Sequence, residues 1–280
     1  MTFNAALTDS YIMYKIIIYL TCILLFGTAS ADTKTKAIEL EVSKLVRTPA
    51  YVEKVLDSYG LVGMPRQVFR EHLQEIYKSN EVISMLVKEM LNAGAEKWDK
   101  DKGPDYAKKF GAELFLSYAM KGMPRLTFEE QKAFIKFLLN WMQIASDDDC
   151  KKLLVTGGKT SAIDDANLEM KYYFRMEKEE LRRYFSILRK SLIAEITDYP
   201  HAKNLNQQQA KIADDAYENE MLKRVENGLI DEKTLNAMAD MSSASPKLAC
   251  AAGRQIFSTM LSMKGLGGEL FLTKFINSLQ

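Results

Sequence analysis

Turn-forming residues are scarce in this chain of 280 residues, which has only 14 glycines and 6 prolines. Such low counts argue against a turn-rich β architecture and make a helical protein the default. No one sign of charge dominates either, since 38 lysines and arginines face 37 acidic residues, a formal net charge of +1. This balance excludes the global positive field that collects nucleic acid or anionic membranes, so an electrostatic partner must meet a local patch.

The sequence also lacks the spacings that carry catalysis or metal binding. Its two histidines, His72 and His201, have no ligand neighbour at zinc spacing, and His72 is expected at the surface. The sequence contains no zinc-protease pattern (His-Glu-x-x-His), no hydrolase nucleophile pattern (Gly-x-Ser-x-Gly), no Cys-x-x-Cys and no calcium-binding loop. It also contains no Asn-x-Ser/Thr glycosylation site. Residues 157–160 resemble the end of a phosphate-binding loop, but Leu153 stands where that loop needs glycine. We therefore interpret 157–160 as a turn and predict no catalytic residue, metal or cofactor.

The first 31 residues have the three parts of a secretory signal peptide. Lys15 precedes the apolar run 16–26, and Ala29 and Ala31 stand at the small-residue positions before a cleavage site. Cleavage after Ala31 would begin the mature chain at Asp32 and leave no stable membrane anchor. If translation starts at Met13 and not at Met1, the signal-peptide pattern is more compact. The alternatives are a membrane anchor or a buried helix, but the uncharged run 16–31 is shorter than the roughly 20 residues that span a bilayer. The sequence predicts a periplasmic or secreted protein, with a bacterial source favoured.

Cleavage after Ala31 would remove Cys22 and leave two cysteines, Cys150 and Cys250. An even pair in an exported chain predicts a disulfide, because oxidising compartments retain such bonds. The alternative is two separately buried thiols.

Apolar residues recur at three- and four-residue spacing through most of the mature chain, as amphipathic helices require. Thr127 and Glu130 form a capping-box pattern, and the helix 134–144 that follows is expected in the core. Other helix starts are predicted at Thr48, Asn80, Asn206 and Asp231. We expect an all-α fold, a multi-helix bundle or an irregular helical array built from hairpins. An N-terminal part, 32–145, and a C-terminal part, 146–280, are expected to pack as one domain.

One motif occurs twice. Ser-Tyr, Gly-Met-Pro-Arg and Phe recur with identical gaps at 58–69 and 117–128, an offset of 59 residues, with no convincing third copy. Each copy predicts a helix that ends, turns through glycine and restarts with proline in its first turn. Arginine after such a turn should project outward. The residues predicted to contact a partner are two from each turn and two from a later basic segment: Met64, Arg66, Met123, Arg125, Arg182 and Arg183.

That basic segment, 171–190, interleaves seven basic and three acidic residues with aromatics, for a local charge of +4. An amphipathic helix with an aromatic core face and a solvated basic face explains this pattern, and an anionic protein or lipid headgroup is the functional alternative. Nucleic acid is not expected for an exported chain. The favoured function is a non-enzymatic binding protein: an inhibitor, immunity or chaperone-like factor with a protein partner. The rivals are a cell-envelope hydrolase whose carboxylates meet only in three dimensions, and a structural envelope protein.

Overall fold

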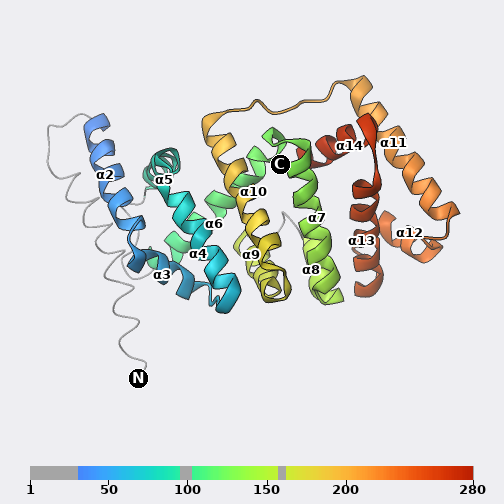
Figure 1. Ribbon diagram of the computed structural model, residues 1–280, viewed down its shortest axis with the longest axis horizontal. Coiled ribbons are helices and arrows are strands. Elements are labelled where there is room, and N and C mark those ends of the chain that lie inside the picture. Colours follow the sequence, from blue (N-terminus) through green and yellow to red (C-terminus); the bar gives the residue numbers. More distant parts are fainter. Residues whose placement is uncertain (1–30, 95–102, 157–161, 280) are drawn as a thin grey trace. The chain divides into compact units, whose positions relative to one another are not determined.

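The computed structural model describes residues 31–94, 103–156 and 162–279. Within these ranges the chain is helical with no strand, which confirms the all-α prediction of a helical array (Figure 1). The predicted signal peptide before Ala31 and the turn at 157–160 lie outside the described residues. No helix in the described ranges is long and apolar enough to cross a membrane.

The chain divides into two compact units, residues 1–115 and 116–280. The described residues of unit 1 form four helices and the beginning of a fifth, which continues into unit 2. They are α2 (Ala31–Val46), α3 (Pro49–Ser58), α4 (Gly63–Lys78), α5 (Asn80–Asn92) and α6 (Gly103–Gly122).

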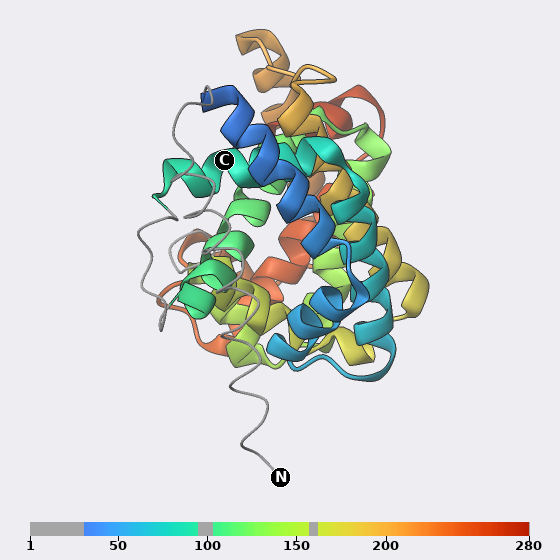
Figure 2. The same cartoon turned by 90° about the vertical axis from the view of Figure 1, so that its left-hand side faces the viewer.

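In unit 1, α2 packs against α5, and α3 packs against α4. Figure 2 looks at this unit with α2 facing the viewer and α3 continuing from its end. Ile38, Val42 and Val46 are buried along one face of α2, at the four-residue spacing of an amphipathic helix. Arg47, just beyond α2, donates to the carbonyls of Tyr77 and Lys78 at the end of α4. This arginine therefore satisfies carbonyls that a helix end leaves without partners.

Unit 2 begins within α6 and contains the remaining helices. In chain order these are the 3₁₀ turn η2 (Met123–Arg125), α7 (Phe128–Ile144), α8 (Asp147–Thr156), α9 (Ala162–Met170), the 3₁₀ turn η3 (Tyr173–Arg175), α10 (Lys178–Thr197), α11 (Gln207–Glu226), α12 (Glu232–Ala239), α13 (Pro246–Ser262) and α14 (Gly265–Asn277).

Helices α7 and α10 run antiparallel and share an aromatic core. Lys190 pairs with Glu130 at one end of the contact, while Asn140 bonds Glu180 at the other. Between them the rings of Phe137 and Tyr184 stack with centroids 3.7 Å apart. The predicted core helix is confirmed by the buried side chains of α7, which include Phe134, Phe137, Trp141 and Met142.

Helix α13 lies against α7, α8 and α12. Its Cys250 forms a disulfide with Cys150 of α8, and both residues are fully buried. One turn later, Arg254 donates to the carbonyl of Met142 near the end of α7. The predicted disulfide is therefore present and links the middle of unit 2 to its C-terminal helices.

Most helix starts agree with the capping residues expected from the sequence. Thr48, Thr127, Asn206 and Asp231 each accept a hydrogen bond from a backbone amide in the first turn of their helix. The prediction at Asn80 is wrong by one residue, because Ser79 is the cap and accepts from the amide of Val82.

The glycines of the repeated motif serve two different purposes. Gly63 has a φ of +60° and open space around it, so it supplies a left-handed residue at the start of α4. Gly122 has a φ of −80°, but a Cβ built on it would lie 1.8 Å from the carbonyl oxygen of Ser191 on α10. The second copy also ends in η2 before α7 starts at Phe128, so the expected restart at Pro124 is wrong. The same glycine of the motif therefore allows a turn in one copy and a close contact between helices in the other.

A third related turn exists that the sequence analysis did not find. Residues 120–125 and 170–175 align with an offset of 50 and share Met, Lys and Arg at matching positions, and Glu-Glu follows four residues after each Arg. Both segments end in a 3₁₀ turn, η2 or η3, closed by the same bond: Leu126 donates to Met123, and Met176 donates to Tyr173. Tyrosine and phenylalanine replace glycine and proline in this copy, which is why a motif defined by those two residues missed it.

The close approach at Gly122 predicts that Gly122→Ala destabilises the protein. The new methyl group must displace the backbone of α10, and overpacking of this kind costs about 1–3 kcal/mol. Gly111→Ala is the matched control, because it lies in the same helix with nothing near its Cβ position. The control should be neutral or slightly stabilising by helix propensity. Urea unfolding measures both, and equal stabilities for the two variants would contradict this packing.

Removing the cross-link should destabilise unit 2. Replacing Cys150 and Cys250 together by alanine opens a loop with a sequence separation of 100 and should lower the free energy of unfolding by about 2–5 kcal/mol. Thermal unfolding with and without a reductant measures the effect. A reductant should lower the melting temperature of the wild-type protein but leave that of the double variant unchanged, and equal melting temperatures for the oxidised wild type and the variant would contradict a stabilising bond.

Candidate partner-binding surfaces

Arg66 folds back onto its own unit rather than projecting from it. Its guanidinium lies 2.7 Å from carboxylate oxygens of both Glu53 and Asp57 on α3 and also donates to the carbonyl of Leu61. Arg70 shares Glu53 with it. Since the Arg66 side chain is only 22% exposed, this arginine holds α4 against α3.

Arg125 makes the corresponding contacts in unit 2 with partners from distant sequence. It pairs with Glu195 at 2.9 Å and with Asp198 at 2.7 Å, and it donates to the carbonyl of Pro200. Asp198 ends α10 with a φ of +52°. The Arg125 side chain is 13% exposed, so its main contacts are within the fold. Contact of Arg66 and Arg125 with a partner stays a prediction, and the outward projection expected of them is wrong.

The other four residues predicted at a binding surface differ in exposure. Met123 is fully buried, so it presents no surface to a partner, whereas Met64 is partly buried. Arg182 is partly exposed and pairs with Glu179 one turn earlier. Arg183 is exposed on α10. Two of the six residues, Met64 and Arg66, belong to unit 1 and the other four to unit 2.

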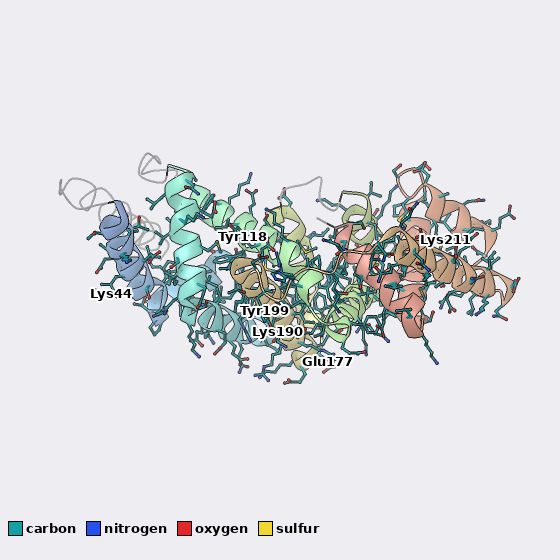
Figure 3. All side chains as sticks on the ribbon, turned by 90° about the horizontal axis from the view of Figure 1, so that it is seen from above. Lys44, Tyr118, Glu177, Lys190, Tyr199 and Lys211 are labelled. Atoms are coloured by element: carbon teal, nitrogen blue, oxygen red, sulfur yellow. A yellow bond between two sulfur atoms is a disulfide. The ribbon has the colours of Figure 1, made fainter. Side chains whose placement is uncertain are left out.

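The basic segment 171–190 is partly neutralised by the fold. Lys171 lies 3.7 Å from Asp149, Arg182 pairs with Glu179, and Lys190, labelled in Figure 3, pairs with Glu130. Two of these three acids, Asp149 and Glu130, come from outside the segment, so the local charge of +4 overstates the field. Arg175 also stacks on the rings of Tyr172 and Phe174. The structure therefore favours an amphipathic packing role for this segment.

A cluster of one half-buried carboxylate and two buried phenols was not anticipated. Glu169 accepts hydrogen bonds from the hydroxyls of Tyr184 at 2.9 Å and Tyr173 at 3.2 Å, and Trp141 donates to its backbone carbonyl. Burial, and next the nearby Glu169 carboxylate, raise the pKa of both tyrosines well above 10. A single carboxylate held by phenols that stay protonated suits packing of α9 on α10 better than hydrolysis by paired carboxylates.

Other candidate chemical groups are engaged in structure. The expectation that His72 lies at the surface is wrong, since it is buried in α4 and its ring stacks on Phe69. Asp214, from one of the sequence's acidic pairs, bonds Lys274. Within the described ranges, no three or more His, Cys, Asp or Glu side chains come together as a metal site.

Helix α11 presents the largest set of exposed apolar side chains in unit 2. One side of it docks on α14: Tyr217 stacks on Phe271 at 4.2 Å, and a Cβ on Gly267 would lie 2.5 Å from the Cβ of Ala216. On the same side Arg224 bonds Gln255 and Ser258 of α13. In Figure 1 α11 lies at the edge of unit 2, beside α14 and α13.

The opposite side of α11 carries an exposed stripe. Leu222 is 53% exposed, Val225 36% and Leu229, just after the helix, 57%. The spacing of three residues places Leu222 and Val225 on one face, and three exposed carboxylates occupy the same face by helical geometry. Leu229 follows the helix, after the left-handed turn at Gly228. We call this set the α11 outer face: Asp215, Glu218, Leu222, Val225, Glu226 and Leu229. Leu235 of the following helix, α12, is also 41% exposed.

Comparisons of this chain with protein-family models, curated proteins and solved structures found no match. The case for a function therefore depends on the surfaces of the chain itself.

The ion pairs of Glu53 predict a pH-dependent stability in unit 1. Hydrogen bonds from Arg70, and then from Arg66, lower the pKa of Glu53 from 4.5 to about 2. A carboxylate with a lowered folded pKa stabilises the fold above its unfolded pKa and loses this effect as the pH falls through the folded value.

Between pH values of about 4.5 and about 2, the wild-type protein should therefore lose more stability than Glu53→Gln. Urea unfolding across this range measures the difference between the two proteins. The difference should be largest near neutral pH and should shrink on acidification, whereas a constant difference would contradict the lowered pKa.

Proposed function

We propose that this chain is an exported, non-enzymatic helical protein that binds a protein partner in the periplasm or outside the cell. The observation that carries the proposal is the α11 outer face, where Leu222 and Leu229 are more than half exposed. Clustered exposed apolar side chains with polar residues around them are typical of protein interaction sites.

Two further features support export. The signal-peptide pattern ends at Ala31, where α2 begins, so cleavage there would leave this helix nearly complete. The buried disulfide between Cys150 and Cys250 is compatible with an oxidising compartment.

The hydrolase alternative gains little from the described carboxylates. Glu53 and Glu195 pair with arginines, and Glu169 accepts from two tyrosine hydroxyls. Inverting and retaining glycosidases both need two carboxyl groups facing one substrate bond. An inhibitor, immunity or chaperone-like role fits the exposed apolar stripe better.

Binding through α11 can be tested with Leu222→Glu combined with Leu229→Glu. The mature chain, Asp32–Gln280, is used as bait in an extract of its own cell envelope, and the double variant should lose the captured partner. Its melting temperature should stay near that of the wild type, because both side chains are already exposed.

Val62→Glu is the control, because Val62 is 77% exposed and belongs to unit 1. This control should retain the partner. Capture that survives the double substitution, or that the control also abolishes, would contradict binding through α11. Reversing the charges of Arg66 and Arg125 would be a less specific test, because it would also break ion pairs that stabilise the fold.

A further inference from the structure

The α11 outer face is acidic as well as apolar. Asp215, Glu218 and Glu226 are exposed and share the face with Leu222 by the helical period. Lys211, labelled in Figure 3, falls on the same face one turn before Asp215. One lysine against three carboxylates leaves this surface with a charge of about −2 at neutral pH. Asp214, one turn before Glu218, pairs with Lys274 of α14, so that pair is neutral as a whole and does not change this charge.

We propose that the α11 outer face binds an amphipathic helix of a partner protein in which lysines or arginines flank the apolar residues. This inference rests on the proposed function and adds the chemistry of the partner. Leu222 and Val225 lie about one turn apart on α11, about 5 Å along its axis, which matches apolar side chains at positions i and i+3 or i+4 of a docking helix. Leu229 adds an exposed apolar side chain just beyond the end of the helix. The carboxylates beside them favour bases on that helix.

The same charges argue against a second copy of this chain as the occupant. If two copies of α11 packed antiparallel about Leu222, Glu218 of one copy would lie opposite Glu226 of the other. If they packed parallel and in register, each carboxylate would face its own equivalent. Both arrangements place like charges together in a partly desolvated contact, which is unfavourable. Anionic lipid surfaces are disfavoured for the same reason.

The test uses two synthetic helical peptides with the same leucine pattern, one with lysine and one with glutamate at every polar position. Binding to the full mature chain is measured by fluorescence anisotropy. The lysine peptide should bind, its affinity should fall as salt increases, and the glutamate peptide should not bind. Equal binding of both peptides, or no binding of the lysine peptide, would overturn the proposal.

Two matched double variants test whether the lysine peptide binds the carboxylates of the α11 outer face or acidic residues anywhere on the protein. Glu218→Gln with Glu226→Gln should weaken the lysine peptide about tenfold, the effect of losing two exposed charge pairs. Glu129→Gln with Glu177→Gln removes two exposed carboxylates from other helix starts and should leave binding unchanged. Equal weakening by both double variants would overturn the assignment to α11.

Two further outcomes show whether the proposed function or only the basic-helix inference is wrong. If the native partner is captured through Leu222 but the lysine peptide does not bind, the proposed function stands and the basic-helix inference falls. If analytical ultracentrifugation finds a dimer that Leu222→Glu abolishes, the occupant is a second copy, and the inference is likewise overturned.

Discussion

The bond between Cys150 and Cys250 is the constraint on which the arrangement of unit 2 depends. It fixes α13 to α8 in a fully buried position, and Arg254 ties the same helix to the end of α7. Helices α13 and α14 then hold one side of α11 through Arg224 and Tyr217. Because that side is occupied, Leu222 and Val225 are left on the other. The exposed stripe therefore follows from how the C-terminal helices are anchored.

Local features of the sequence predicted much of the fold. Capping residues such as Thr127 and Asn206 act within four residues of the chain, so their patterns can be recognised without tertiary structure. The aromatic period of residues 134–144 identified a core helix, and the parity of the cysteines after signal cleavage predicted the disulfide. These inferences depend on spacing or counting alone.

The features that the sequence analysis missed depend on residues far apart in the chain. The Arg125 side chain is mostly buried because it pairs with Glu195 and Asp198 at the end of α10. A local sequence pattern cannot predict partners that lie 70 or more positions away. Glu169 similarly meets Tyr184 only once α9 packs on α10. The exposure of Leu222 and Val225 on α11 could not be predicted either, because it depends on which side of this polar helix packs against α13 and α14. A repeat defined by glycine and proline could not reveal the copy at η3.

The two arginine turns illustrate how one short motif can serve different structural ends. In unit 1, Arg66 binds acids of the preceding helix, whereas in unit 2 Arg125 binds acids 70 or more residues later. Gly63 is needed for its backbone angle and Gly122 for its missing side chain. The shared residues therefore lie at a helix boundary in both copies, but they make different contacts there. This moves the search for a partner surface from the turns to α11.

The most direct test of a binding role is photo-crosslinking in living cells of the source organism. A photoreactive amino acid is placed at position 222, and at position 62 as a control. Our account predicts a crosslink to one envelope protein from position 222 and none to that protein from position 62. No crosslink from position 222, or identical products from both positions, would contradict the claim that this chain acts through the outer face of α11.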